Sequence, residues 1–222
     1  METYIERALL SKDEVSALQH SLRELRSKNL FRLIPQGIYE AEKSVVEHCV
    51  HLGKIANLVH SKLLELESSV SSLRLDKIWH VESTSKSSHV GKLPYLLHFD
   101  KARYLKAMIY LSDVGDGDGA ICVGTASPET FEARRRKLPE GYKEYQLNSV
   151  APEEAGCVIE MTGSAGDCIY FDTNTPHKAG ILHTGHMREV LRLDFVHPID
   201  EGFLRKVCSK FNCVLNQGFR IK

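Results

Sequence analysis

Residues 98–127 read HFDKARYLKAMIYLSDVGDGDGAICVGTAS, and the order of patterns in this stretch decides the fold. A histidine-x-aspartate triplet is followed by an apolar run, a turn rich in glycine and aspartate, and a second short apolar run. Short apolar runs between turn signals are typical of β-strands. Side chains two residues apart on an extended segment lie on the same face, so His98 and Asp100 can both reach one ion.

A second stretch, residues 166–195, reads GDCIYFDTNTPHKAGILHTGHMREVLRLDF and supplies a further histidine, His177. Two imidazoles and one carboxylate on one face of a first-row divalent metal leave three coordination positions open. This arrangement suits non-haem Fe(II) that activates dioxygen. His98, Asp100 and His177 are therefore the candidate metal-binding and catalytic residues.

The chain ahead of these stretches has helical patterns. Ser11 and Glu14 form a capping-box pattern, and apolar residues follow at three- and four-residue spacing, which predicts a helix over residues 12–26. A second helical period predicts a helix over residues 39–67. From residue 73 onward the pattern changes to short extended segments, at residues 75–81, 104–111, 120–123, 156–160, 168–171 and 189–196.

The order of these elements limits the fold class. Helices that precede many short strands, instead of alternating with them, disfavour a parallel doubly wound sheet. Short strands separated by glycine, proline or aspartate favour a sandwich or barrel. The sequence therefore predicts a mainly β protein with flanking helices, and its 222 residues fit one domain.

Charge and cysteine usage bear on partners and compartment. The 29 lysines and arginines balance 29 aspartates and glutamates, which gives no electrostatic reason to expect nucleic acid or a membrane surface as the main partner. The amino terminus lacks the apolar run of a signal peptide, and no apolar stretch is long enough to span a bilayer. The six cysteines form no CxxC pair. We expect a cytoplasmic protein with reduced thiols.

The two quoted stretches resemble the core of the phytanoyl-CoA dioxygenase family, which consists of Fe(II)- and 2-oxoglutarate-dependent oxygenases. The family pattern is a histidine-x-aspartate, a turn with an Asn-Gly-like pair, a Gly-Asp turn, a distal histidine and an arginine about ten residues later. The resemblance implies that His98, Asp100 and His177 hold Fe(II). It also implies that Arg188 binds the distal carboxylate of 2-oxoglutarate, for which the planar fork of a guanidinium is well suited.

The resemblance covers residues 96–196 and has one departure. Asp118 and Gly119 stand where Asn-Gly is usual, but the family's PGSH-like stretch reads Val-Gly-Thr-Ala at residues 123–126. The implied architecture is a double-stranded β-helix, or jelly roll, at residues 73–200. Residues 1–72 would be mainly helical support, and residues 201–222 a C-terminal extension of the same domain.

Three further residues are candidates for the 2-oxoglutarate pocket. Lys106, Met108 and Tyr110 share one face of the predicted strand. Counting back from Gly119 places Met108 where members of the family carry a pocket-lining residue. We list all three as cofactor-binding candidates, while a plain core position is the alternative for Met108.

The implied activity is hydroxylation of an unactivated C–H bond of a small molecule, and an anionic substrate is one option. Dioxygen and 2-oxoglutarate would be co-substrates, and succinate and CO2 would be released. Desaturation and ring closure are other outcomes of the same chemistry. Two alternatives stay open: a cupin-type metal enzyme that does not use 2-oxoglutarate, and a catalytically silent jelly-roll binding protein. The oligomeric state is open.

A second histidine-carboxylate triplet and a basic run are both expected to have structural roles. A second histidine-x-carboxylate triplet, His80 to Glu82, lacks the following turn and distal histidine, so we interpret it as structural. The basic run of residues 134–137 is expected to be a solvated face, with an anion-binding role as the alternative.

Overall fold

The computed structural model describes residues 1–34, 38–70, 72–85, 94–139 and 147–197. The strands and helices are, in chain order, β1 (Tyr4–Glu6), α1 (Lys12–Ser27), β2 (Arg32–Ile34), β3 (Ile38–Glu42), η1 (Lys43–His48), α2 (Val50–Leu66), β4 (Arg74–Thr84), β5 (Leu105–Tyr110), β6 (Cys122–Gly124), α3 (Pro128–Arg136), η3 (Pro152–Glu154), β7 (Val158–Glu160), β8 (Cys168–Asp172), β9 (His177–Lys178) and β10 (Met187–Val196).

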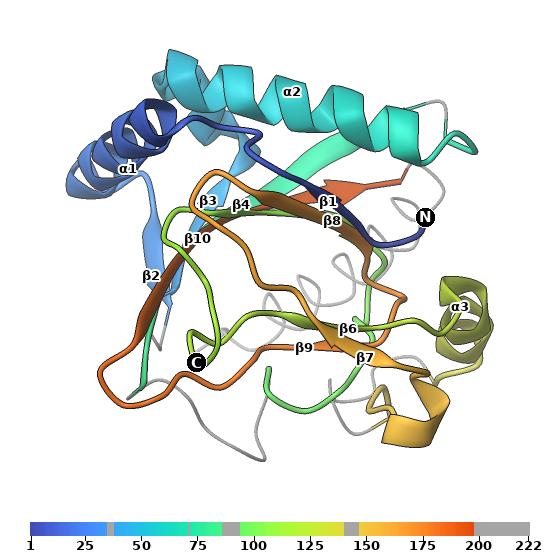
Figure 1. Ribbon diagram of the computed structural model, residues 1–222. Helices are drawn as coiled ribbons and strands as arrows, with labels where there is room; N and C mark the ends of the chain where they lie inside the picture. Colours follow the sequence, from blue (N-terminus) through green and yellow to red (C-terminus); the bar gives the residue numbers. More distant parts are fainter. Residues whose placement is uncertain (35–37, 71, 86–93, 140–146, 198–222) are drawn as a thin grey trace, which may run out of the picture.

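Two antiparallel sheets form the body of the protein (Figure 1). The larger has seven strands in the order β1-β8-β5-β10-β4-β3-β2, and the smaller has the order β7-β6-β9. Helices α1 and α2 cover the outer face of the large sheet, and the small sheet lies on its opposite side (Figure 1). The prediction of a mainly β fold of the jelly-roll class with flanking helices is confirmed.

The two faces of the large sheet have different partners because side chains alternate along each strand. On the outer face, Ile109 and Leu191 pack with Leu22 of α1 and Val59 of α2 in one buried cluster. The inner face looks toward the small sheet. A second buried cluster fills that side with residues of both sheets: Met108, Tyr110, Val114, Ala120, Ile121, Val123, Met161, Ile169, Phe171 and Val190.

The first predicted helix is confirmed, and the second begins later than predicted. Helix α1 starts at the predicted capping box, in which Ser11 and Glu14 exchange hydrogen bonds. Residues 39–48, by contrast, form strand β3 and the short helix η1, and α2 begins only at residue 50. Strand β3 pairs with β4, and this tertiary pairing overrides the local helical pattern.

The first 72 residues also contribute strands that the sequence did not reveal. Strand β1 pairs with β8 at one edge of the large sheet, and β2 and β3 form the other edge. Strands of three to five residues carry too few alternations to be recognised from their pattern. Helix α3 follows β6, so the helices do not all precede the strands.

Two further observations concern the helices and the cysteines of the described residues. None of the described helices has both the length and the apolar character needed to cross a bilayer. Among the described residues Cys49, Cys122, Cys157 and Cys168 form no disulfide. Cys208 and Cys213 lie outside the described residues, as does the predicted extension at 201–222.

The Gly166–Asp167 turn joins the amino terminus of α1 to the large sheet. Gly166 has a φ of +97°, and an added Cβ would lie 2.1 Å from the backbone oxygen of Leu10. Gly185 also has a positive φ, of +86°, but an added Cβ there would meet nothing within 4 Å. A comparison of alanine substitutions at the two positions therefore separates the cost of backbone strain from that of steric overlap.

We expect Gly166→Ala to lower the free energy of unfolding by about 3–5 kcal/mol, because left-handed strain adds to a backbone collision. Gly185→Ala should cost only about 1–2 kcal/mol, from the strain alone. Urea denaturation of both variants measures the difference. Equal costs at the two positions would contradict the close approach of Leu10 to Gly166.

Candidate metal centre

Three predicted ligands meet at one point between the two sheets. The Nε2 atom of His177 lies 3.3 Å from Oδ1 of Asp100, and Nε2 of His98 lies 3.6 Å from the same oxygen. The two imidazole ring centroids are 4.6 Å apart. One ligand atom from each residue therefore falls within 4.8 Å of the others, so the three can share one metal ion.

Backbone pairing holds the two histidines together. The N–H of His98 donates to the carbonyl of His177 at 3.0 Å, and the N–H of His177 donates back at 2.8 Å. The predicted extended stretch around His98 is not a full strand but an isolated antiparallel bridge to residue 177. Ligands 79 residues apart in the chain are thus fixed by two mutual hydrogen bonds, from positions 98 and 177.

The outer nitrogens of the imidazoles fix the ring orientations. Nδ1 of His98 lies 2.6 Å from the carbonyl oxygen of Leu96, and Nδ1 of His177 lies 2.8 Å from that of Thr175. A carbonyl oxygen only accepts, so each Nδ1 carries the proton and each Nε2 offers its lone pair toward Asp100. Burial lowers the pKa of His177, which favours the neutral, metal-binding imidazole.

Lys106 sets the charge of the carboxylate in this centre. Its Nζ lies 2.5 Å from Oδ2 of Asp100, while Oδ1 faces the histidines. Burial by itself would raise the pKa of Asp100, but the Lys106 ammonium against it outweighs burial and holds that pKa well below its usual value. Asp100 is therefore an ionised ligand, as a divalent cation requires.

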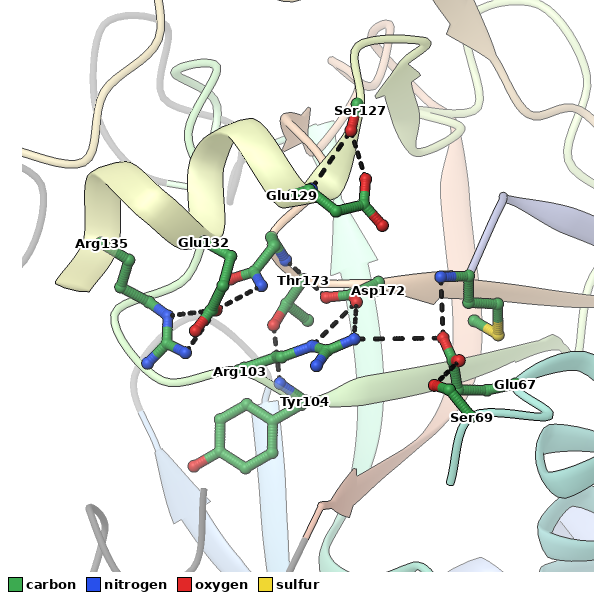
Figure 2. Close-up of polar contacts among 12 residues, drawn as sticks. Glu67, Ser69, Arg103, Tyr104, Ser127, Glu129, Glu132, Arg135, Asp172 and Thr173 are labelled. Atoms are coloured by element: carbon green, nitrogen blue, oxygen red, sulfur yellow. Dashed lines mark hydrogen bonds and ion pairs between the residues drawn. The ribbon is translucent and has the colours of Figure 1, made fainter. Parts of the chain in front are cut away.

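A polar network braces the loops that carry the ligands (Figure 2). Arg103, three residues after Asp100, donates from Nε at 2.9 Å and from Nη2 at 2.6 Å to one oxygen of Asp172, which is fully buried. The N–H of Asp100 donates to the carbonyl of Thr173 at 2.9 Å, and the N–H of Tyr104 donates to the Thr173 hydroxyl at 2.8 Å. The segment after His98 is thus fastened to the loop that leads to His177.

The same network continues into helix α3. Glu132 accepts from Arg135 and, at 2.7 Å, from the side-chain amide of Asn174, two residues beyond Asp172. Burial opposes ionisation of Glu132, but Arg135 and Arg136 outweigh it and lower its pKa to about 2. On the other side, Glu67 pairs with the amino-terminal NH3⁺ at 2.8 Å and approaches Arg103 (Figure 2).

We expect Arg103→Ala to lower the free energy of unfolding by about 2–3 kcal/mol, because it leaves the buried Asp172 carboxylate without its cation. Arg136→Ala is the matched control, since Arg136 is 69% exposed and its pair with Glu132 should contribute less than about 1 kcal/mol. Metal affinity should also fall about 10-fold or more in Arg103→Ala only. Equal losses of stability and metal affinity in the two variants would contradict a bracing role for Arg103.

Arg188 is a buried cation whose contacts leave it available for an anion. It stands at the start of β10, is 6% exposed, and donates from Nη1 to the carbonyl of Gly119. Within the described part of the chain no carboxylate lies in ion-pair distance, and its Nε has no hydrogen-bond partner. Burial lowers the pKa of Arg188, which reflects the cost of an uncompensated charge. A bound carboxylate would remove that cost.

The other pocket candidates take different places on the inner face. Met108 and Tyr110 both belong to the inner cluster, and the Tyr110 hydroxyl donates to the carbonyl of Met161 at 2.7 Å. Burial raises the pKa of Tyr110 to about 12, while nearby Arg188 works in the opposite direction. Tyr110 therefore stands near Arg188, whereas Lys106 stands at Asp100.

The His80 triplet belongs to a separate group with Glu82 and Glu189, whose ligand atoms could also hold a metal. Glu189 was not foreseen, because it comes from β10 and lies next to the triplet only through strand pairing. Here, protein cations and amides already occupy the carboxylates. Arg26 lies 2.6 Å from Glu82, and Gln19 donates to Glu189 at 2.6 Å. This satisfied network supports the structural interpretation.

The basic run ends helix α3, and only part of it is a solvated face, since Arg136 and Lys137 are exposed. Arg135 is buried, and both Arg135 and Arg136 pair with Glu132. Arg134 pairs with Glu154 and donates to the carbonyl of Ser149, which bridges to His98. The expectation of a solvated face is therefore wrong for Arg135, because that side chain is buried and pairs with Glu132 one turn earlier on α3.

Three solved structures share this fold. The carbocyclase SnoK from nogalamycin biosynthesis, titled a non-haem α-ketoglutarate-dependent enzyme, is 16% identical, with 87% of this chain and 79% of that chain covered and a TM-score of 0.63. The epimerase SnoN, in complex with Fe3+, α-ketoglutarate and nogalamycin RO, is 16% identical, with coverages of 88% and 79% and a TM-score of 0.58. HygX from Streptomyces hygroscopicus, with nickel, 2-oxoglutarate and hygromycin B, is 14% identical, with coverages of 89% and 83% and a TM-score of 0.60.

At these identities the similarity establishes the fold alone. A comparison with curated proteins gives no match. The family assignment comes from the sequence, because the profile described as phytanoyl-CoA dioxygenase (PhyH) matches residues 4–190 and so includes all three residues of the centre and Arg188. The chain therefore belongs to the phytanoyl-CoA dioxygenase family, the Fe(II)- and 2-oxoglutarate-dependent oxygenases that its two motif stretches resemble.

Proposed function

We propose that this protein is an Fe(II)- and 2-oxoglutarate-dependent oxygenase that hydroxylates an unactivated C–H bond of a small molecule. The observation that carries the proposal is the buried guanidinium of Arg188, which has no counter-ion among the described residues. Burying an unpaired charge costs free energy, and an anionic ligand that pairs with the guanidinium would offset that cost. A distal carboxylate of 2-oxoglutarate meets that need.

The residues present fit the metal. His98, Asp100 and His177 would hold Fe(II), because their donor atoms converge and both imidazoles direct Nε2 toward the common point. When bound, Fe(II) with 2-oxoglutarate and dioxygen supplies oxidation of a C–H bond, with release of succinate and CO2. Family membership and the similar solved structures that contain iron or nickel with 2-oxoglutarate support this assignment.

The chain's own groups would orient the co-substrate. Arg188 can bind the distal carboxylate through two parallel N–H donors, which fixes one end of the molecule. Met108 and Tyr110 would line its carbon chain, since both face the same interior as Arg188. Lys106 neutralises Asp100 and would keep the total charge near the metal low when a second carboxylate arrives.

Hydroxylation is the proposed outcome among several that this fold supports. The similar structures include an epimerase and a carbocyclase, each titled as dependent on α-ketoglutarate. A retained carboxylate at Asp100 favours oxygenation over halogenation, since halogenases of this kind replace it with a small residue. Labelled dioxygen distinguishes the outcomes, because hydroxylation adds one 18O atom to the oxidised substrate, whereas epimerisation and ring closure add none to it; succinate takes up the other atom in each case.

The test of the proposal begins with the protein purified under argon. Addition of Fe(II) and 2-oxoglutarate should give a weak visible metal-to-ligand absorption, and air should then start slow succinate formation without substrate. A cupin-type enzyme that does not use 2-oxoglutarate would give neither signal. A silent binding protein would give the absorption without succinate. Either result would overturn the proposal.

A further inference from the structure

A second arginine on β10 faces the same interior as the metal centre. Residues directly opposite each other on paired strands lie on one face, and β10 places Arg192 opposite Met108 and Asp194 opposite Lys106. Lys106 in turn contacts Asp100. Asp194 therefore lies next to Lys106, which contacts Asp100 of the candidate metal centre. Arg192 lies two residues before Asp194 on β10, on the same face.

Arg192 is held in a fixed position by two neighbours. Its guanidinium lies over the ring of Trp79 on β4, 4.2 Å from the ring centroid, and its Nη2 donates to Oδ2 of Asp194 at 2.9 Å. The indole N–H of Trp79 donates to the same oxygen at 2.7 Å. One buried carboxylate oxygen thus orients both the arginine and the ring beneath it, which reduces the entropy that a ligand-binding arginine would otherwise lose.

These contacts do not use every hydrogen-bond donor of the guanidinium. Its side chain is 24% exposed, and its Nε has no hydrogen-bond partner within the described residues. Oδ2 of Asp194 already accepts hydrogen bonds from Trp79 and Arg192. A second carboxylate, Asp76, is the extra residue at the β-bulge of β4 and pairs with Arg74 at 3.4 Å. Oδ2 of Asp194 is therefore engaged, whereas its buried Oδ1 has no hydrogen-bond partner among the described residues. The guanidinium N–H groups that Asp194 does not take are available to an acceptor.

Tyr104 connects this cluster to the metal centre. Burial raises its pKa above the usual range, the carboxylates of Asp76, Asp194 and Asp100 add to the increase, and Arg192 opposes it. The pKa of the half-buried Tyr104 thus responds to both groups of charges. Figure 2 shows this ring directed away from the Arg103–Asp172 contact. Bulges such as that at Asp76 are frequent beside active sites, where they redirect side chains.

We propose that Arg192, stacked on Trp79 and oriented by Asp194, is the subsite for an oxyanion of the primary substrate, either a carboxylate or a phosphate ester. The proposal rests on the proposed function for the identity of the neighbouring centre. Arg192 is four residues from Arg188 on the same strand, roughly 13 Å along it, so the two arginines can bind different molecules at the same time. The substrate class is accordingly a small organic acid or phosphate ester.

The experiment uses the only tryptophan in the sequence, Trp79, as the reporter. The full chain is loaded with Mn(II) and saturating 2-oxoglutarate, and is titrated with methyl phosphate and, separately, with propionate. Chloride keeps the ionic strength constant. We expect a saturable change in Trp79 emission with at least one of the two anions, which identifies the preferred oxyanion. Half-saturation should shift at least 10-fold higher in Arg192→Gln.

Two further variants make the outcome of the titration decisive. Arg23→Gln removes an arginine that is 61% exposed on α1 and should leave the titration unchanged. Arg192→Lys keeps the charge but loses the fork, so it should bind more weakly than the wild type even if Arg192→Gln fails to fold. No saturable signal in the wild type, or equal half-saturation in both Arg192 variants and the wild type, would overturn the subsite. So would a signal seen only without 2-oxoglutarate.

The same titration without metal and 2-oxoglutarate separates the two proposals. If the protein forms no succinate and binds no 2-oxoglutarate, the proposed function fails. A saturable signal that depends on Arg192 would nevertheless still establish the oxyanion subsite. Conversely, normal succinate formation with no anion-dependent emission change would leave the proposed function in place and overturn the subsite.

Discussion

His177→Ala and Asp100→Ala should each reduce iron-dependent succinate formation by more than about 100-fold. The loss of an outer hydrogen-bond partner alone typically costs 10–100-fold in metal affinity or activity, and the loss of a ligand should cost more. His98→Ala should behave in the same way, since the three donor atoms lie within 4.8 Å of one another. Succinate formed per enzyme, measured with saturating 2-oxoglutarate and no added substrate, gives the result.

The second carboxylate–histidine group supplies a matched control for this prediction. Glu82→Gln alters a second group of three candidate metal ligands, which has one histidine and two glutamates and is already engaged by Arg26. Its succinate formation should stay within about 3-fold of the wild type. Mn(II) binding followed by electron paramagnetic resonance separates metal loss from misfolding. If Asp100→Ala retained turnover while Glu82→Gln lost it, the centre would have been assigned to the wrong group.

Arg188→Lys should raise the 2-oxoglutarate concentration needed for half-maximal succinate formation by at least about 10-fold, or about 1.4 kcal/mol. A lysine keeps the charge but loses the two parallel donors that match a carboxylate. The buried position also makes a misplaced charge costly, since Arg188 is 6% exposed. The measurement is a 2-oxoglutarate titration of succinate formation under saturating Fe(II).

Arg192→Lys is the control on the same strand and the same face. It should change the 2-oxoglutarate requirement by less than about 3-fold, because Arg192 is engaged with Trp79 and Asp194, four residues along β10 from Arg188. A similar increase in both variants would place the 2-oxoglutarate anchor elsewhere. An increase in Arg192→Lys alone would exchange the roles of the two arginines.

Local patterns were sufficient for most of the core. The capping box at Ser11 fixed the start of α1, and the apolar runs identified β4, β5, β8 and β10 to within about three residues. Local patterns failed at residues 39–48, where apolar residues at helical spacing predicted a helix but the chain forms strand β3 and the short helix η1. The pairing of β3 with β4 is a long-range interaction, and long-range pairing can override a weak local preference.

Some residues of the site could not have been predicted from their neighbours in the chain. Asp172 and Glu132 are polar residues without a motif, yet each braces a loop of the centre. Asn148 is another, since its side-chain amide donates to the carbonyl of Phe99, between His98 and Asp100, at 2.6 Å. Lys106 was expected to contact 2-oxoglutarate, and the fold places its ammonium against Asp100. These positions depend on which loops meet in space, and no local spacing encodes that meeting.

The sequence by itself determined the mainly β fold class, the candidate ligands His98, Asp100 and His177, and the family. Motif spacing and strand alternation are local properties that a short stretch displays. Only the tertiary structure decided that the second triplet is satisfied by Arg26 and Gln19, and that Arg188 is buried without a carboxylate partner. The physical reason is that burial and charge compensation depend on residues far apart in the chain, so they exist only after the sheets have closed.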